Sequence, residues 1–183
     1  MRQPGDRAPA PPPLDLVQDL VNTVDIEMER DHLTTVADLR GFCAAHSLKA
    51  PRLTKDDVAQ IRMLREELRA VAGAHAGEDV PPETLRQLSG RLAAAPLRLV
   101  IHSAGDVTIR PAPGVTGASA LVAQVASAII AAQAAGTWSR LKACGSVGCR
   151  WAYYDRSPAG RSRWCTMSIC GSREKMRRYR ARS

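Results

Sequence analysis

An α+β fold is predicted for this chain of 183 residues by three features of its sequence. Apolar residues recur at helical spacing in several segments before residue 96. Two short runs with β-strand character, 97–102 and 107–111, then flank the turn-forming residues Ser-Ala-Gly-Asp. Four of the five cysteines lie after residue 143. We therefore expect a helix-rich N-terminal domain with a short β-hairpin, followed by a small cysteine-rich module.

The helices are expected wherever an apolar stripe follows a capping residue. Thr34 or Thr35 can cap a helix that reaches about residue 46, and Thr54 can cap a longer one. Asp56 and Asp57 suit the first turn of the longer helix because its N-terminus carries a partial positive charge. The expected helices are 14–24, about 35–46, 54–75, about 85–95 and about 117–135.

The N-terminus and the longest apolar segment bear on where the protein is found. Residues 1–13 are rich in proline, have no apolar core of a signal peptide, and are expected to be a disordered lead. The apolar segment 117–136 is mostly alanine and contains Gln124, Ser127 and Gln133, so we expect a buried helix and no membrane span. A soluble cytoplasmic protein follows, and there paired cysteines are more often metal ligands than disulfides.

The N-terminal domain offers no constellation typical of an enzyme. It has no glycine-rich phosphate loop, no Ser/His/Asp arrangement and no HExxH motif. Structural roles are expected for Cys43, His46, His75 and His102. We therefore expect a protein that is not an enzyme.

The charge of the chain is unevenly distributed. Residues 140–183 hold 12 Lys/Arg and 2 Asp/Glu, whereas residues 1–139 hold 14 and 16. A near-neutral body with a strongly basic end suggests that this end meets a polyanion. A merely solvated, soluble terminus is the alternative.

The four clustered cysteines form two pairs, Cys144–x4–Cys149 and Cys165–x4–Cys170. Two close pairs separated by a longer loop are typical of a four-cysteine zinc site, and four thiolates leave no open position on tetrahedral zinc. We expect one structural zinc, with disulfides or a redox pair as alternatives. Tyr153 and Tyr154 are expected to form a short hairpin inside the intervening loop, with its turn at Pro158 and Gly160. Cations near the thiolates are expected from Arg150, Arg163 and Arg173.

After the last cysteine the chain reads GSREKMRRYRARS, which predicts a basic helix. Met176 and Tyr179 lie three residues apart and are expected to pack one face of this helix onto the zinc core. The remaining faces suit a phosphate backbone or a major groove. The residues expected to contact nucleic acid are Arg161, Arg163, Arg173, Lys175, Arg177, Arg178, Arg180 and Arg182.

The segment CRWAYYDRSPAGRSRWCTMSICGSREKMRRYR resembles the CGNR zinc finger. The signature tetrapeptide reads Cys170-Gly171-Ser172-Arg173, with serine in place of the family's asparagine. That change leaves the cysteine ligands intact and removes any contact that the asparagine side chain would make. In this family the finger follows an ABATE domain, which LDLVQDLVNTVD, DLRGFCAAHSL and the alanine-rich helix resemble.

The resemblance implies a domain order and a function. The expected segments are the lead 1–13, an ABATE-like α/β domain over 14–136 that senses a signal or dimerises, and a zinc finger over 138–183. It also implies a transcription regulator that binds duplex DNA, with a small-molecule effector or a homodimer as open questions. The alternatives are an RNA- or ribosome-associated protein, in which Tyr153, Tyr154 and Trp164 would stack on bases, and a thiol redox sensor.

Overall fold

A computed structural model describes residues 7–49 and 51–181. The fold is α+β, as predicted, with helices as the most abundant element and three separate two-stranded antiparallel sheets among the described residues. In chain order the elements are α1 (Leu14–Val21), β1 (Val24–Asp25), β2 (Arg30–Asp31), α2 (Val36–Ala45), α3 (Lys55–Ala74), α4 (Pro82–Ala93), β3 (Leu97–Ile101), β4 (Val107–Pro111), α5 (Gly117–Ala134), β5 (Leu141–Ala143), β6 (Ala152–Tyr154) and α6 (Ser172–Arg180).

The predicted threonine caps are present at two helices. Thr35 caps α2, because its hydroxyl accepts from the backbone N–H of Asp38 and that carboxylate accepts from Thr35 N–H in return. Thr54 and Asp57 form the same reciprocal pair at the start of α3. Such capping boxes satisfy N–H groups that have no partner within the helix, so they fix where each helix begins.

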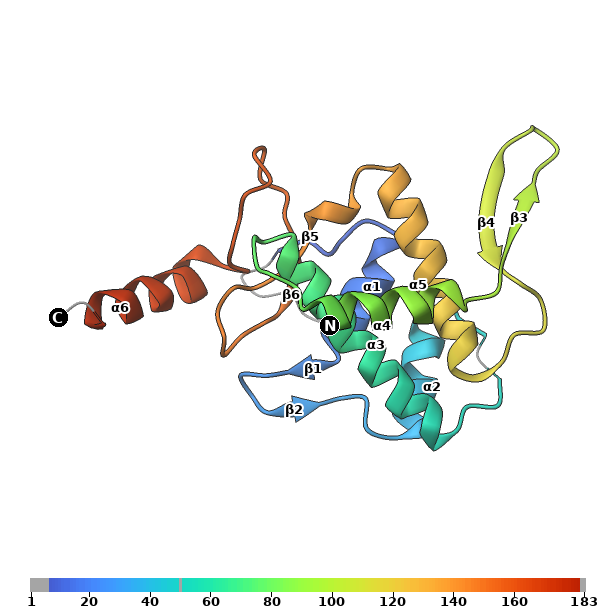
Figure 1. The fold of residues 1–183 in the computed structure, drawn as a ribbon, viewed down its shortest axis with the longest axis horizontal. Coiled ribbons are helices and arrows are strands. Elements are labelled where there is room, and N and C mark those ends of the chain that lie inside the picture. Colours follow the sequence, from blue (N-terminus) through green and yellow to red (C-terminus); the bar gives the residue numbers. More distant parts are fainter. Residues whose placement is uncertain (1–6, 50, 182–183) are drawn as a thin grey trace.

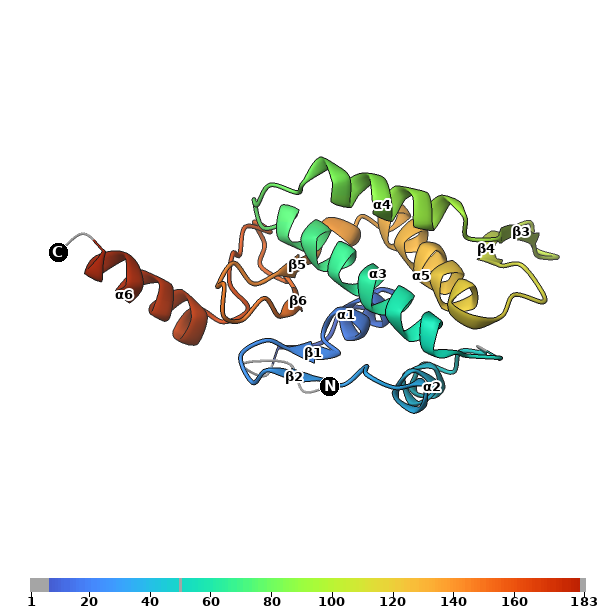
Figure 2. The same cartoon turned by 60° about the horizontal axis from the view of Figure 1, so that its bottom comes forward.

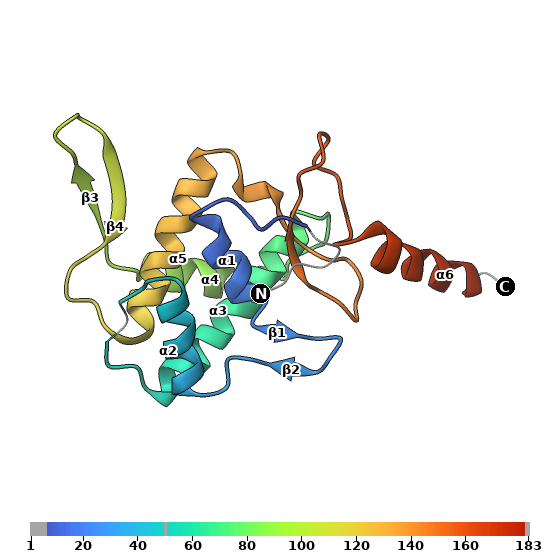
Figure 3. The ribbon, with the colours of Figure 1, turned by 180° about the vertical axis from the view of Figure 1, so that it is seen from behind.

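Helix α3 lies at the centre of the N-terminal body. It contacts α1, α2, α4 and α5. Figure 2 shows α4 on one side of α3 and α2 on the other, and Figure 3 shows α1 on the side that is hidden in Figure 1. The core between these helices is built from the buried apolar residues on the inward stripe of each helix, among them Val17, Leu20, Ile61, Leu64, Leu68, Leu121 and Val125.

The alanine-rich helix α5 belongs to this core, as predicted. It is long and apolar enough to be compared with a membrane span, but 56% of its apolar window is buried inside the protein. Alanine brings neighbouring helices close, and Ala123, Ala128 and Ala132 are all buried. The polar Ser127 is also used internally, since its hydroxyl donates to the carbonyl of Ile109 in β4 at 2.7 Å.

The predicted hairpin at 97–111 is present as β3 and β4, paired from Leu97↔Pro111 to Ile101↔Val107. It projects from one end of the molecule, whereas α6 extends from the other end (Figures 1 and 3). The two most distinctive surface elements therefore lie far from each other.

The last sheet departs from the sequence-based expectation. Tyr153 and Tyr154 pair with Lys142 and Leu141 across the first cysteine pair, so the hairpin does not close at Pro158 and Gly160. The reason lies in the helices on which this sheet packs. Leu141, Ala152 and Tyr154 are buried in the same core as α1 and α3, and this burial selects β5 as the partner of β6.

The segment before α1 is also packed against the protein. Ala10 is buried, and its N–H donates to the side-chain oxygen of Gln18 at 2.6 Å. The guanidinium of Arg7 lies over the ring of Tyr153, 4.8 Å from its centre, and Arg156 donates to the carbonyl of Pro9. Residues 7–13 thus differ from the expected disordered lead, and residues 1–6 lie outside the described part.

Candidate metal centre and nucleic-acid interface

Two backbone turns bring the four cysteines together. The first begins at the end of β5, where Cys144 N–H bonds the carbonyl of Trp151 and Cys149 N–H bonds that of Ser146. Arg150 then takes a positive φ of 52°, which reverses the chain into β6. The second is a π-helical turn over Met167–Gly171, which places Cys170 one wide turn after Cys165. Gly145 N–H donates to the carbonyl of Arg163 at 2.8 Å and joins the two turns.

The four thiols have the geometry of one metal site. Their Sγ atoms all lie within 4.8 Å of one another, with 3.7 Å between Cys149 and Cys165 and 3.6 Å between Cys165 and Cys170. A tetrahedron with Zn–S bonds of about 2.3 Å has edges of about 3.8 Å. All four cysteines are free thiols, and three of them are buried. The arrangement therefore fits a closed, structural zinc site.

The electrostatics of the cluster also favour a cation. Hydrogen bonds from Cys149 and Cys165 lower the pKa of the Cys144 thiol. The hydrogen bond to Cys144 raises the pKa of Cys149, and burial together with the charge of Cys144 raises that of Cys170. One thiolate thus forms at the expense of its neighbours, because like charges repel at this separation. Four thiolates can coexist here only around a cation such as zinc.

The three arginines expected beside the thiolates have different surroundings. Arg150 forms an ion pair with Glu78 at 2.6 and 2.7 Å and also approaches the carbonyl of Cys144. Arg173 pairs at 2.6 Å with Glu27, which lies in the turn between β1 and β2. Arg163 is exposed and forms no ion pair with a described residue. Glu78 and Glu27 therefore tie the first cysteine turn and the start of α6 to the body, and no sequence motif marks either carboxylate.

A buried ion pair shapes the loop between the two cysteine pairs. Lys142 donates to Asp155 at 2.9 Å, and both side chains are almost fully buried. The carboxylate of Asp155 also accepts from the N–H and hydroxyl of Ser162 and from the N–H of Ser157. Lys142 reaches the carbonyl of Gly160 at 2.6 Å. Since both oxygens of Asp155 are satisfied, the loop folds around this pair without needing its own hairpin.

Side chains at the C-terminal half of α3 form hydrogen bonds with the backbone around the first cysteine turn. The buried guanidinium of Arg69 donates to the carbonyl of Val21 at 2.5 Å and to that of Arg150 at 2.7 Å. His75, at the end of the same helix, donates from Nδ1 to the carbonyl of Leu141 at 2.8 Å and packs edge-on against Trp138. Burial lowers the pKa of His75, which favours the neutral ring. His75 has a structural role, as expected, and it connects the end of α3 to β5.

The other residues expected to be structural lie in the body. Cys43 is buried in the main core. His46 ends α2, contacts the ring of Phe42 and lies 3.4 Å from the carboxylate of Asp19. His102 contacts the hydroxyl of Thr108 across the β3–β4 hairpin. None of these belongs to a metal cluster among the described residues.

The predicted basic helix is present as α6, and it extends away from the body (Figure 1). Its packing differs from the expectation. Met176 is 51% exposed and Tyr179 is 69% exposed, so neither is buried on the zinc core. The reason is the preceding π-helical turn, which is the element of the described chain that α6 contacts most and which directs the helix outward. Among the described side chains of the helix, Glu174 is instead the buried one.

The basic side chains expected to bind nucleic acid fall into three groups. Arg173 and Arg177 form ion pairs with Glu27 and Glu174. Arg182 and the side chain of Arg178 lie outside the described part of the chain. The exposed residues that form no ion pair with a described residue are Arg161, Arg163, Lys175 and Arg180.

Comparison with known families agrees with this architecture. The model of the CGNR zinc finger matches residues 140–183. The model of the ABATE family, described as "Putative stress-induced transcription regulator", matches residues 14–137. Among curated proteins, none matches the chain. Both parts of the resemblance are confirmed, and in the predicted order. The chain therefore belongs to the ABATE family and ends in a CGNR zinc finger with one structural zinc.

Proposed function

We propose that this protein is a transcription regulator whose C-terminal helix binds duplex DNA. The observation that carries the proposal is the placement of α6: a basic, exposed helix whose start is fixed by Cys170 and whose length extends clear of the body. A helix free on most of its circumference can enter a groove without moving the rest of the protein. The metal cluster, formed by Cys144, Cys149, Cys165 and Cys170, would set the direction of the helix.

The arginines of α6 would divide by role. Arg173, three residues after Cys170, is the candidate for a base contact, which it would make after leaving its ion pair with Glu27. Arg177, Arg178 and Arg180 follow and are candidates for phosphate contacts, with Lys175 and Arg182. Arg161 and Arg163, in the loop before Cys165, would add phosphate contacts beside the helix. We also propose that residues 14–136 sense a signal or dimerise, and that the protein acts in the cytoplasm.

The test is fluorescence anisotropy with a genomic site found by footprinting and a scrambled duplex. We expect the Arg177/Arg178/Arg180→Ala variant to bind both duplexes more weakly, with a salt slope lower by roughly three. The matched control is Arg40/Arg62/Arg86→Ala, which removes the same charge from the body. Equal binding by the α6 variant and the wild type at every salt concentration would contradict the proposal.

RNA binding is the main alternative, and the aromatic residues argue against its stacking form. Tyr153 is fully buried and Tyr154 is 8% exposed, so neither is available to a base. Trp164 packs partly against the cysteine cluster. Tighter binding to structured RNA than to either duplex in the same assay would favour this alternative. Loss of DNA binding on mild oxidation, with recovery after reduction and zinc addition, would add the redox role.

A further inference from the structure

The β3–β4 hairpin has one strand edge that pairs with no other strand of the described chain. Two backbone hydrogen bonds continue its register at either end: His102 N–H donates to the carbonyl of Asp106 at 2.8 Å, and Ala112 N–H donates to that of Pro96 at 2.7 Å. Bonded and non-bonded pairs alternate along an antiparallel ladder, so the even-numbered residues of β3 bond to β4. The residues whose N–H and C=O groups point away from β4 are Leu97, Leu99 and Ile101.

The outer edge of β4 differs because α5 covers it. The two elements pack together, and the hydroxyl of Ser127 donates to the carbonyl of Ile109 at 2.7 Å. Ile109 is the register partner of Leu99, so the same alternation directs its carbonyl outward, toward α5. β3 is the strand of the hairpin that lies farther from the body (Figures 1 and 3). The open edge of the hairpin is therefore the edge of β3.

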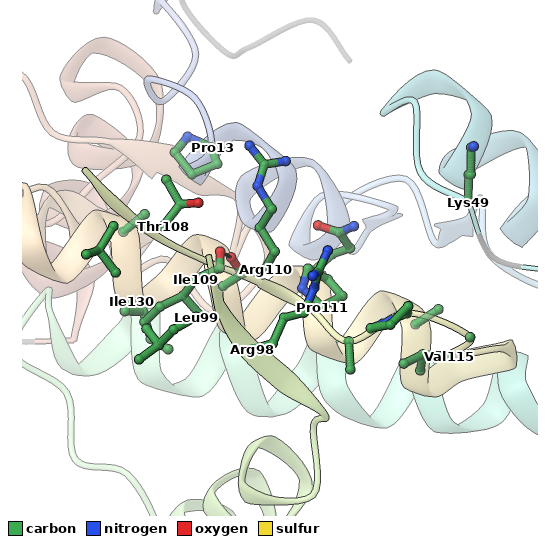
Figure 4. Close-up of a pocket in the computed structure, with 18 of the residues that line it drawn as sticks. Pro13, Lys49, Arg98, Leu99, Thr108, Ile109, Arg110, Pro111, Val115 and Ile130 are labelled. Carbon is green, nitrogen blue, oxygen red and sulfur yellow. Dashed lines mark hydrogen bonds between the residues drawn. The ribbon is translucent and has the colours of Figure 1, made fainter. Parts of the chain in front are cut away.

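This open edge borders an exposed apolar face. Leu99 is 67% exposed and Ile101 is 75% exposed, and Val107, the register partner of Ile101, is 57% exposed on the same face. Side chains alternate along a strand, so Arg98 and Arg110 lie on the opposite face. Figure 4 shows Leu99 and the guanidinium of Arg110 on different sides of the hairpin. An edge that combines unpaired backbone groups with apolar side chains is a template for pairing with another strand.

A second copy of β3 matches this edge in one antiparallel register. Centring the pair on Leu99 places Leu97 opposite Ile101 of the other copy, so that the outward backbone groups of both edges bond each other. The apolar side chains of the two copies then meet on one face, where opposite pairs stabilise a sheet. Arg98 lies opposite Val100 in this register, whereas centring on Arg98 would set two arginines directly opposite each other, which is destabilising. The edge is therefore complementary to itself.

We propose that two copies of this chain pair through β3 and form a continuous four-stranded antiparallel sheet, with a two-fold axis at Leu99. The inference rests on the dimerising role in the proposed function and gives that role a surface. The edge has five residues and buries less than the roughly 800 Å² per partner of a standard interface, so we expect a dimer with a Kd on the order of 10 µM. The hairpin and α6 lie at opposite ends of the molecule (Figure 1), so DNA binding by one copy does not require the dimer.

The first test is sedimentation velocity of the zinc-loaded full chain from roughly 1 to 200 µM. We expect the mean mass to rise from that of a monomer toward that of a dimer. Leu99→Pro should abolish the rise, because proline lacks the outward N–H at the axis and leaves the bonds of Arg98 and Val100 to β4 intact. Leu99→Lys should also abolish it by placing two like charges at the axis. Leu99→Val keeps the N–H and an apolar side chain, and as the matched control it should still dimerise.

The second test fixes the register by cross-linking. Under mild oxidation of the zinc-loaded protein, Leu99→Cys should form a disulfide between two copies, because opposite Cα atoms of a bonded antiparallel pair lie about 5.5 Å apart, within disulfide range. Ser103→Cys, in the exposed hairpin turn, is the matched control. In the proposed register its two copies lie about 27 Å apart and should not cross-link. The wild type gives the background from its own cysteines.

The other outcomes overturn the proposal. A monomer at every concentration would do so, as would a dimer that Leu99→Pro and Leu99→Lys leave intact, or cross-linking of Ser103→Cys but not of Leu99→Cys. Dissociation by Val107→Ser but not by Leu99→Pro would show that two apolar faces stack while the edges stay apart. Circular dichroism and zinc content establish that each variant is folded. DNA anisotropy is measured separately: a monomer that binds duplex DNA overturns the dimer alone, and a dimer that does not bind it overturns the DNA-binding proposal alone.

Discussion

Asn22 and Ala152, 130 residues apart, exchange two hydrogen bonds. The side-chain amide of Asn22 donates to the carbonyl of Ala152 at 2.8 Å, and the N–H of Ala152 donates back to the side-chain oxygen at 2.8 Å. Asn22 thus provides the backbone of β6 with the hydrogen-bond donor and acceptor that a neighbouring strand would provide. Both residues are fully buried. The end of α1 in the ABATE region and β6 in the zinc-finger region are therefore joined by buried hydrogen bonds.

Replacing Asn22 by alanine is expected to destabilise the whole protein by about 2–3 kcal/mol. The change leaves the buried N–H of Ala152 without a partner, and an unsatisfied buried group retains its full desolvation cost. Urea unfolding of the zinc-loaded protein measures the loss. The exposed variant Gln87→Ala is the control and should stay within about 0.5 kcal/mol of the wild type. A similarly small effect of Asn22→Ala would show that the pair contributes little.

Removing zinc is expected to destabilise the helices as well as the finger. Each chain should hold one zinc, and Cys165→Ser should lose it. Two separate domains over 14–136 and 138–183 would unfold independently, but Leu141, Ala152 and Tyr154 lie in the shared core. We therefore expect a chelator to lower the thermal midpoint of the helical circular dichroism signal. An unchanged midpoint, with proteolysis confined to the segment after residue 140, would instead support independent folding.

The substitution Asp155→Asn is expected to cost about 3–5 kcal/mol near neutral pH, because it leaves the buried Lys142 without a counter-charge. Urea unfolding measures this cost, and Asp106→Asn, in the exposed hairpin turn, serves as the control. An effect below about 1 kcal/mol would contradict the importance of the pair.

The cost of Asp155→Asn should also depend on pH. Burial raises the pKa of Asp155, but hydrogen bonds from Ser157, Lys142 and Ser162 outweigh burial and hold the pKa below its ordinary value of 3.8. A lowered folded-state pKa stabilises the protein above the unfolded-state value, and this stabilisation is lost as the pH falls through the folded-state value. The difference from wild type should be constant between about pH 7 and pH 5 and shrink below about pH 4. A difference that shrinks already above about pH 5 would contradict this assignment.

Glu27→Gln is expected to increase DNA affinity by about two- to fivefold. The carboxylate of Glu27 holds Arg173 in an exposed ion pair, which solvent weakens, and Arg173 must leave it to reach a base. Glu29→Gln removes the same charge from the same β1–β2 turn but forms no ion pair among the described residues. Anisotropy titrations compare the two. Equal gains in DNA affinity for the two variants would show that Glu27 acts through its charge alone and not through the ion pair. Unchanged affinity in both variants would show that this turn does not affect DNA binding.

Local signals in the sequence were sufficient for most single elements. Thr35 and Thr54 mark the starts of α2 and α3 because a cap and its partner lie three residues apart. The β3–β4 hairpin and the paired cysteines are also local patterns. The resemblance to the CGNR finger and the ABATE domain was confirmed over both regions.

Contacts between distant segments were not predictable in the same way. The partner strand of Tyr154 precedes the cysteine turn, and only burial against α1 and α3 selects it over a hairpin at Pro158. Arg69, which bonds the carbonyls of Val21 and Arg150, looks like an ordinary helix-surface residue in sequence. The exposure of Met176 depends on the direction that the π-helical turn gives to α6, which apolar spacing alone does not specify.

The strands β5 and β6, which flank the first cysteine turn, limit which N-terminal domains this finger can be joined to. β5 and β6 contribute Leu141, Ala152 and Tyr154 to the core of the preceding region, and β6 is completed by Asn22. A chimera that joins residues 140–183 to an unrelated partner would expose those three side chains and leave the strand edge open. The finger can therefore be transferred only to N-terminal domains that bury these side chains and bond the edge of β6. Grafting experiments can measure which domains meet this requirement.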